Sequence, residues 1–345
     1  MPQIVGPTRK RWPGPLGSQR RLGYTPGRNT LVNPMSLPEI FRGRLAVPVV
    51  GAPMFLVSHP ELVIAQCLAG IPGSFPTLNA RPLELLEEWL KRISAAVAAA
   101  PTAAPFGVNL VVNKANTRLA EDVALTEKYK VPFVITSVGE PGELVKRVHA
   151  YGGIVFHDVI SVRHAKKAIA AGVDGLILVC AGAGGHAGAL SPFALVHEVR
   201  QIFAGTIILA GAISTGAQVK AAQVMGADLA YMGTRFIATQ EAHADEAYKR
   251  MIVETTAADI VYTPHFSGIS ANYLRPSIVA AGLDPALVLG PREGASLGLS
   301  DKDDKGPKAW RDIWSAGQGV GAIVDAPPVA ELVARMKAEY DEVKV

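Results

Sequence analysis

Short apolar runs and longer amphipathic segments alternate along the chain from residue 46. The short runs are rich in Val, Ile and Leu and have no polar face, which is typical of parallel strands buried on both sides. Eight such runs predict strands, at 47–51, 71–75, 106–110, 132–136, 154–158, 175–179, 206–210 and 228–232. The run at 71–75 is the weakest candidate because an internal Pro and Gly disfavour a strand.

The segments between these runs have the period of helices. The clearest places Leu86, Trp89, Leu90, Ile93 and Val97 on one stripe. Other helices are predicted at 60–69, 118–129, 141–151, 161–171, 192–203 and 215–225. This alternation predicts an α/β protein with a (β/α)8 TIM barrel over residues 46–240. An open, doubly wound sheet is the alternative.

The alternation stops after residue 240. A helix at 243–256, a loop-rich stretch and a last helix at about 328–342 predict an appended layer, residues 241–345, which covers the active-site face. The loop at 262–275 mixes aromatic and polar residues, and we hypothesise that it closes the site. Residues 1–34 are rich in Pro and Gly and are basic, so we expect a disordered arm.

The net charge of +4 arises at one end of the chain. Residues 1–44 contain eight of the 34 basic residues and one of the 30 acidic ones, so the remainder is slightly acidic. The charge therefore does not indicate a nucleic-acid partner for the barrel. Two cysteines in apolar runs do not make a disulfide framework and fit a reducing compartment. Since the longest charge-free stretches contain Pro, Gly and polar residues, we expect no membrane span and a cytoplasmic protein.

Candidate chemistry follows the strands, because active sites of parallel barrels lie at the carboxyl ends of the strands. The seventh strand runs into Gly211 and Ala212, and the eighth into Gly233 and Thr234. Two such turns side by side predict a phosphate site built from backbone N–H groups. Ser214 or Thr215 is placed to cap the helix that follows.

The sixth strand runs into a glycine loop, 182–188, which presents His186. This imidazole is a candidate general base, or a donor to an anionic substrate. The loop fails the dinucleotide fingerprint because Ala187 takes the third glycine position. His157 ends the fifth strand, where it would bind a phosphate or Asp158, or serve the structure only. Cys180 is more consistent with a packed thiol than with a nucleophile, and no spacing indicates a metal site.

Several segments together resemble the nitronate monooxygenase family, the FMN-dependent enzymes formerly called 2-nitropropane dioxygenases. They are VVGAPMF at 49–55, FGVN at 106–109, AGAGGHAG at 181–188, MGADLAYMGTRFIAT at 225–239 and IWSAGQGVGAI at 313–323. The glycine loop with its histidine and the MGTRF turn are shared by a wider group of flavin barrels. That group includes flavin-containing enoyl-ACP reductases and NADH:quinone reductases.

The resemblance implies roles for individual residues. His186 matches the catalytic histidine of the family. The resemblance also implies that a set of residues contacts the cofactor: Ala52, Pro53, Met54, Thr77, Asn109, Gly184, Gly185, Gly211, Ala212, Gly233, Thr234, Gln318 and Gly319. We add His157 to this set because it lies at the end of a predicted strand. Two positions depart from the family pattern. Ala212 replaces a second glycine, and Gly182 stands where an acidic residue is often found, which removes a carboxylate that could tune His186.

The implied activity is oxidation of alkyl nitronates, and by extension nitroalkanes, by O2 to a carbonyl compound and nitrite. A small-molecule substrate, O2 and a homodimer are the expected partners. The alternative is an NAD(P)H-dependent flavin reductase acting on a quinone or an enoyl thioester. A third interpretation, a flavin- or nucleic-acid-binding protein without turnover, would use the basic arm and leave the barrel-mouth residues without a role.

Overall fold

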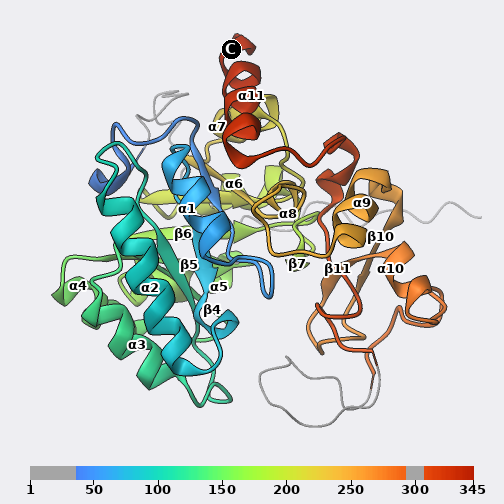
Figure 1. Cartoon of the computed structure of the whole chain (residues 1–345), viewed down its shortest axis with the longest axis horizontal. Coiled ribbons are helices and arrows are strands. Elements are labelled where there is room, and N and C mark those ends of the chain that lie inside the picture. The colour runs from blue at the N-terminus through green and yellow to red at the C-terminus, as the bar shows by residue number, and fades with distance from the viewer. Residues whose placement is uncertain (1–35, 293–306) are drawn as a thin grey trace, which may run out of the picture. The chain divides into compact units, whose positions relative to one another are not determined.

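Eight parallel strands form a nearly closed barrel in the computed structural model of the chain, which describes residues 36–292 and 307–345 (Figure 1). They are β1 (Val49–Gly51), β2 (Ser74–Pro76), β3 (Gly107–Val111), β4 (Phe133–Ser137), β5 (Ile154–Val159), β6 (Gly175–Val179), β8 (Thr206–Ala210) and β9 (Leu229–Met232). The predicted TIM barrel is confirmed, and the open sheet is wrong. The predicted arm at 1–34 lies outside the described residues.

The strands are ordered β1-β9-β8-β6-β5-β4-β3-β2, so β1 and β2 form the seam of the barrel. The Gly51 N–H donates to the Pro72 carbonyl across 2.9 Å, and the Ser74 hydroxyl donates to the Gly51 carbonyl across 2.6 Å. β2 begins later than predicted, because Pro72 lacks an N–H and Gly73 lies against α1. A Cβ on Gly73 would stand 2.8 Å from the Val63 carbonyl oxygen.

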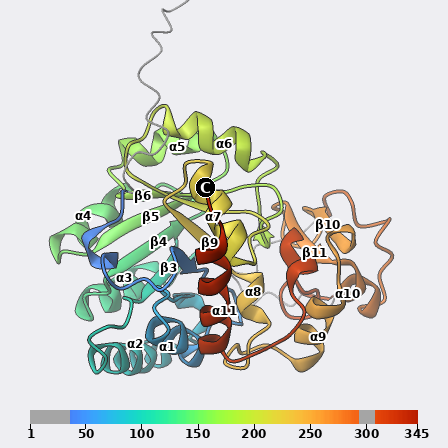
Figure 2. The ribbon, with the colours of Figure 1, turned by 90° about the horizontal axis from the view of Figure 1, so that it is seen from above.

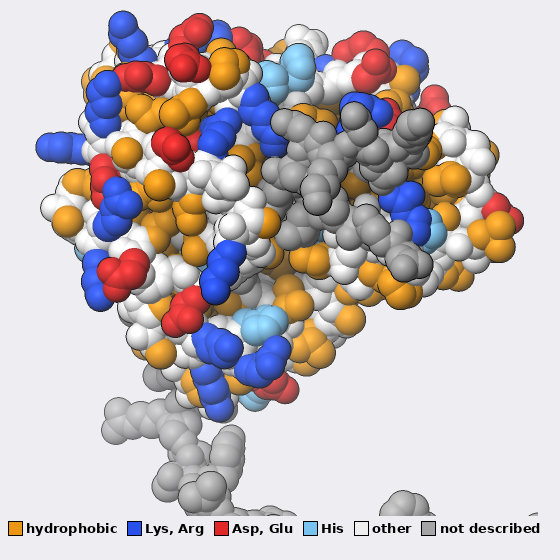
Figure 3. Space-filling model, turned by 90° about the horizontal axis from the view of Figure 1, so that it is seen from below, with side chains coloured by type: hydrophobic (Ala, Val, Ile, Leu, Met, Phe, Trp, Pro, Cys, Tyr) orange, Lys and Arg blue, Asp and Glu red, His pale blue; other side chains and the backbone are white. Residues whose placement is uncertain are grey.

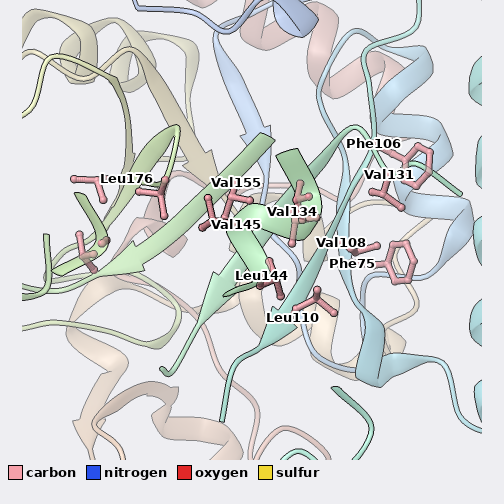
Figure 4. Packing of buried hydrophobic residues seen from close by; sticks show 14 of the residues in the cluster. Phe75, Phe106, Val108, Leu110, Val131, Val134, Leu144, Val145, Val155 and Leu176 are labelled. Atoms are coloured by element: carbon pink, nitrogen blue, oxygen red, sulfur yellow. The ribbon is translucent and has the colours of Figure 1, made fainter. Parts of the chain in front are cut away.

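Seven helices cover the outside of the barrel at the predicted positions (Figure 2). They are α1 (Pro60–Leu68), α2 (Leu83–Ala98), α3 (Leu119–Lys128), α4 (Gly142–Ala150), α5 (Val162–Ala170), α6 (Pro192–Arg200) and α7 (Gly216–Val224). Figure 4 shows how Phe75, Val108 and Val134 on the strands and Leu144 on α4 bury their side chains in one core. Thr215 caps α7 through a reciprocal bond with Gln218, as predicted.

The segment after the barrel contains more regular structure than the sequence predicted. Its helices are α9 (Glu246–Glu254), α10 (Arg275–Ala280) and α11 (Val329–Glu342), with short 3-10 turns at η3 (Ala257–Asp259) and η4 (Gln318–Ala322). Earlier in the chain, the short helix α8 (Thr234–Ile237) follows β9, and 3-10 turns lie at η1 (Glu39–Phe41) before the barrel and η2 (Thr77–Asn79) after β2. The helices predicted at 243–256 and 328–342 are confirmed as α9 and α11. None of the helices in the described ranges is long and apolar enough to cross a membrane.

A second sheet, which the sequence did not predict, joins the appended layer to the barrel. It consists of β7 (Gly185–His186), β10 (Ile260–Thr263) and β11 (Ala271–Leu274), antiparallel in the order β10-β11-β7. Because β7 belongs to the glycine loop after β6, this sheet fixes that loop against the appended layer. We call β7, β10 and β11 the lid sheet.

The last helix, α11, packs on α7 and α1 (Figure 2). The contact with α7 requires Gly216, because a Cβ there would stand 2.0 Å from the Met336 carbonyl oxygen. The Glu339 carboxylate accepts a hydrogen bond of 2.7 Å from the Gly216 N–H. The N-terminus of α7 is therefore already occupied by a side chain of the same protein.

Candidate functional site

A cavity of about 770 Å³ lies at the carboxyl ends of the barrel strands, between the barrel and the lid sheet. All of the predicted site residues line it except Thr77 and Gln318. Those that line it are Ala52, Pro53, Met54, Asn109, His157, Gly184, Gly185, His186, Gly211, Ala212, Gly233, Thr234 and Gly319. The structure therefore brings together residues from seven separate segments of the sequence.

The two glycine turns form one wall of this cavity. Within the described ranges, the N–H groups of Gly211, Gly233 and Thr234 have no hydrogen-bond acceptor. A Cβ on Gly211 would stand 2.9 Å from the Ala181 carbonyl oxygen, so the turn needs glycine there. Because Glu339 occupies the N-terminus of α7, a bound anion would rely on these turns and not on that helix.

Ala212 contributes less to this wall than the sequence suggested. Its N–H, which was expected to be available, donates to the Gly182 carbonyl across 3.3 Å. Its φ of +55° lies in the left-handed region, which costs a residue with a Cβ roughly 1–2 kcal/mol. This conformation explains why glycine is the more usual residue at such a turn.

The glycine loop after β6 is held by the segment 315–319. The Gly182 carbonyl accepts a second hydrogen bond, of 2.9 Å, from the Gln318 N–H. The Ser315 hydroxyl accepts a bond of 2.7 Å from the Gly185 N–H. A Cβ on Gly317 would stand 2.6 Å from the Gly182 carbonyl oxygen, so the two segments touch backbone to backbone. Gln318 thus acts through its backbone, and its side chain is exposed.

Thr77 is fully buried and points away from the cavity. Its hydroxyl donates to the Asp122 carboxylate across 2.7 Å, and Arg118 binds the other oxygen of the same carboxylate at 2.8 Å. Arg118 also donates to the carbonyls of Thr77 and Ala80. This network fixes the turn after β2, so Thr77 supports the cavity wall from behind.

Two asparagines shape the wall on the β1–β3 side. The Asn109 side-chain NH2 group donates to the Ser137 hydroxyl across 3.1 Å. Within the described chain, no donor binds the Asn109 side-chain oxygen, Oδ1. Asn79 accepts from the Leu56 N–H and donates to the carbonyls of Met54 and Ser58, each within 3.0 Å. Asn79 therefore fixes the loop that carries Met54.

His157 faces the barrel interior, as predicted, but does not bind Asp158. Its Nδ1 lies 2.7 Å from the Thr136 hydroxyl, which also lies 3.2 Å from the Phe156 carbonyl oxygen. Burial, with a smaller contribution from the nearby His164, lowers the pKa of His157 to about 4. The ring is therefore neutral at physiological pH.

Asp158 and Tyr231 form a polar pair in the cavity that the sequence analysis did not assign. The Asp158 Oδ1 atom and the Tyr231 hydroxyl are buried and have no hydrogen-bond partner among the described residues. Burial raises the pKa of Asp158 to about 7, and burial together with the Asp158 charge raises that of Tyr231. Unpartnered buried polar groups are costly, so this pair is suited to bind a polar ligand.

His186 enters the cavity from the lid sheet. Its backbone pairs with Ala271 of β11, its Nε2 lies 2.8 Å from the Ser267 hydroxyl, and its ring meets Trp310 edge to face at 5.2 Å. Burial lowers the pKa of His186 to about 4, so the imidazole is neutral at physiological pH. It can accept a proton there and does not supply a positive charge.

The rim of the cavity on the α5 side carries positive charge. His164 and Lys167 line the rim, and burial, Arg163 and Lys167 lower the pKa of His164. On the face drawn in Figure 3, Lys, Arg and His side chains are interspersed with acidic and hydrophobic ones. The apolar side chains of Ile160 and Ile269 lie on the same rim, and both are exposed.

Other candidates from the sequence lie away from this chemistry. Cys180 is fully buried, and burial raises its pKa to about 12, as expected for a packed thiol. In the parts of the chain that the structure describes, no three His, Cys, Asp or Glu side chains are close enough to hold a metal ion. The segment 262–275 supplies the end of β10 and all of β11, and closure of the site by this segment stays a prediction.

The sequence analysis did not identify Ser267, Trp310 and Tyr231 as site residues. It named Asp158 only as a partner of His157 and not as a residue of the cavity. Ser267 and His186 are 81 positions apart, and no local pattern links them. Asp158 and Tyr231 did carry a signal, since each interrupts an apolar strand with a polar side chain near its carboxyl end. In a barrel, such a residue either faces the interior site or is buried at a cost.

Comparisons with known proteins agree with this geometry. A family model described as nitronate monooxygenase matches residues 113–339. A nitronate monooxygenase of Paraburkholderia phytofirmans is 28% identical over 86% of this chain and 92% of that protein. A second relative, from Mycobacterium tuberculosis, is 29% identical over 67% of this chain and 64% of that protein. It is named (3aS,4S,5R,7aS)-5-hydroxy-7a-methyl-1-oxo-octahydro-1H-indene-4-carboxyl-CoA dehydrogenase. A solved nitroalkane oxidase from Streptomyces ansochromogenes shares the fold, with a TM-score of 0.74, 24% identity and coverage of 88% and 99%.

Proposed function

Since this chain belongs to the nitronate monooxygenase family and is a flavin oxidoreductase, we propose that it uses FMN to oxidise alkyl nitronates and nitroalkanes by O2. The products would be a carbonyl compound and nitrite. We further propose that the protein is a cytoplasmic homodimer. In this proposal the barrel at 46–240 binds FMN, and the appended layer at 241–345 covers the active-site face. The observation that best supports the proposed oxidation is a neutral imidazole, His186, over a glycine-lined anion cradle.

The residues of the cavity fit FMN. The free N–H groups of Gly211, Gly233 and Thr234 suit one terminal phosphate, and the single pair of turns suits a mononucleotide. Met54 and Asn109 would lie along the ring system, with Gly184 and Gly185 close to it. Ala52, Pro53, His157, Ala212 and Gly319 would complete the lining, while Thr77 and Gln318 would support it from behind. When bound, FMN supplies the electron transfer between substrate and O2.

His186 is the proposed proton acceptor. A neutral nitroalkane must lose its α-proton before oxidation, and a neutral imidazole can take it. The Cα–H bond breaks, its electron pair moves into the nitro group, and the proton passes to the ring. A nitronate has already lost this proton, so it needs no base. Trp310, Ile160 and Met54 give the cavity apolar walls that suit an alkyl chain.

Anaerobic mixing tests this proposal. The purified protein should show the visible bands of bound flavin, and a nitronate should bleach them rapidly while NADH does not. Readmission of O2 should restore the bands and release nitrite. Rapid bleaching by NADH, without bleaching by a nitronate, would contradict the proposed activity.

A second candidate is an NAD(P)H-dependent flavin reductase acting on a quinone or an enoyl thioester. Lys167 on the rim, with Arg163 near His164 on the same helix, favours the thioester form, because a coenzyme A thioester carries several phosphate charges. The name of the mycobacterial relative, a carboxyl-CoA dehydrogenase, points the same way. Under this candidate, NADH would bleach the flavin and an enoyl thioester would reoxidise it without O2.

A further inference from the structure

The turn between β10 and β11 places one hydroxyl among three polar groups. The Ser267 Oγ atom lies 2.8 Å from the His186 Nε2 atom, 3.0 Å from the Ile269 carbonyl oxygen and 3.5 Å from the Tyr273 hydroxyl. Ser267 is buried, with 2% of its surface exposed. Its hydroxyl therefore has no access to bulk water, and its single proton must be shared among these neighbours.

The protons can be assigned by counting donors and acceptors. A carbonyl oxygen only accepts, so the contact with Ile269 is a hydrogen bond only if Ser267 donates its proton there. The lone pairs of Ser267 then accept from the Tyr273 hydroxyl and from a proton on His186 Nε2. The opposite tautomer would leave two oxygen acceptors 3.0 Å apart with no proton between them. A neutral imidazole carries one ring proton, so Nδ1 is bare.

We propose that Ser267 is a positioning residue that holds His186 with its proton on Nε2 and keeps Nδ1 as the proton acceptor of the cavity. Nδ1 has no hydrogen-bond partner within residues 36–292 and 307–345, and His186 lines the cavity. The role of His186 Nδ1 as a proton acceptor rests on the proposed function. The tautomer itself is a property of the protein.

The surroundings of His186 hold the ring in this orientation. The Ala187 N–H donates to the Ser270 carbonyl across 3.2 Å, and the Tyr262 hydroxyl donates to the Ala187 carbonyl across 2.9 Å, so the backbone beside the ring is fixed on two sides. Trp310 closes the edge of the ring and stacks on Tyr273 at 5.3 Å. A flipped ring would place a carbon beside Ser267 and lose the hydrogen bond.

Ser267 also accounts for what happens once the proton has moved. With Nδ1 protonated, the ring is an imidazolium with two N–H donors. The Nε2–H bond to Ser267 then becomes charge-assisted and therefore stronger. Burial opposes this charged form, as the lowered pKa of His186 indicates, and the strengthened bond offsets part of that cost.

Nitrogen NMR of the protein labelled in its histidine rings tests the tautomer directly, with the His186 signals identified by their absence in His186→Asn. The wild-type ring should carry its proton on Nε2 alone. Ser267→Ala should add the form protonated on Nδ1, and Ser267→Thr, which keeps the hydroxyl, should remain like wild type. Ser270→Ala is the matched control, because the Ser270 hydroxyl makes no hydrogen bond within the described chain, and its carbonyl, which binds the Ala187 N–H, is unchanged. A wild-type proton on Nδ1, or no change in Ser267→Ala, would overturn the proposal.

Kinetics separates positioning from mere structural support. For Ser267→Ala, kcat/KM for a neutral nitroalkane should fall about ten-fold, while the value for the matching nitronate changes less than about two-fold. Ser267→Thr should restore the nitroalkane value, and equal losses on both substrates would overturn the positioning role. If wild type shows the expected tautomer but oxidises neither substrate, the proposed function fails and the tautomer assignment stands.

Discussion

The barrel and the lid sheet border the same cavity but contribute to it by different means. The barrel offers backbone: the turns at Gly211 and Gly233 present N–H groups, and a Cβ on Gly211 would stand 2.9 Å from the Ala181 carbonyl oxygen. The lid sheet offers side chains, since His186, with Ser267 and Tyr273 behind it, enters on two short strands and a turn. Ligand binding and proton transfer are thus expected to depend on separable parts of the molecule, and substitutions can test that separation.

The largest expected effect concerns the lid sheet alone. Asparagine at 186 has no basic nitrogen and cannot take a proton, so His186→Asn should lower turnover of a neutral nitroalkane by at least about 10²-fold. Turnover of the nitronate should fall far less, and flavin binding should be unchanged. Steady-state kinetics on both substrates and the visible spectrum measure this. Equal loss on both substrates would contradict the base assignment.

The next effect concerns the barrel alone. The Gly233 φ of −109° suits any residue, and a Cβ there would stand 3.4 Å from Met54 Sδ, which is ordinary contact. Gly233→Ala should therefore fold normally but crowd the phosphate, weakening FMN about ten-fold, or about 1.4 kcal/mol. Fluorescence titration of the apoprotein measures the affinity. Gly321→Ala, where a Cβ meets nothing within 4 Å, is the control, and equal affinities for the two variants would argue against the cradle.

A third effect lies in the barrel interior and depends on pH. Because the pKa of Asp158 is raised from 3.8 to about 7, the folded protein holds this proton more tightly than the unfolded chain does. Protonated Asp158 therefore stabilises the fold at low pH, and ionised Asp158 does not. Between about pH 4 and pH 7 the free energy of unfolding should fall by about 1.4 kcal/mol per pH unit. Asp158→Asn should escape this loss. In urea unfolding, its advantage over wild type should grow from pH 5 to pH 8, and a constant difference would refute the assignment.

The smallest effect concerns strain in one barrel turn. Ala212→Gly should relieve the left-handed conformation, while the unfolded chain gains freedom, so the free energy of unfolding should rise by less than about 1 kcal/mol. Ala210→Gly, two residues earlier in buried β8, should instead destabilise the protein. Urea unfolding of both variants measures the contrast, and destabilisation by Ala212→Gly would show that the turn is not strained.

The two regions also differ in how far the sequence predicted them. The barrel strands were predictable because burial on both faces leaves an uninterrupted apolar run, as in 175–179 and 206–210. The lid sheet was not, since β7 has only two residues and β11 contains Asn272 and Tyr273. β7 exists because it pairs with β11, more than 80 positions further along the sequence.

The same division holds for the site. Glycine turns and His186 could be predicted, because their position after a strand fixes where they lie. Thr77 was placed at the cofactor from resemblance, but its orientation depends on Asp122, which lies 45 positions away on α3. Ser267 could not be found from a local pattern, because only the folded turn brings its hydroxyl to the imidazole.

The contact between α11 and α7 has a consequence for biosynthesis. Glu339 reaches the N–H of Gly216 just after the seventh barrel strand, and α11 also packs on α1, which the ribosome releases long before it. Domains fold as units while synthesis proceeds from the N-terminus. The nascent barrel therefore lacks the cover over α7 and α1 until α11 has left the exit tunnel, and a chain released early would expose the apolar surface that α11 covers.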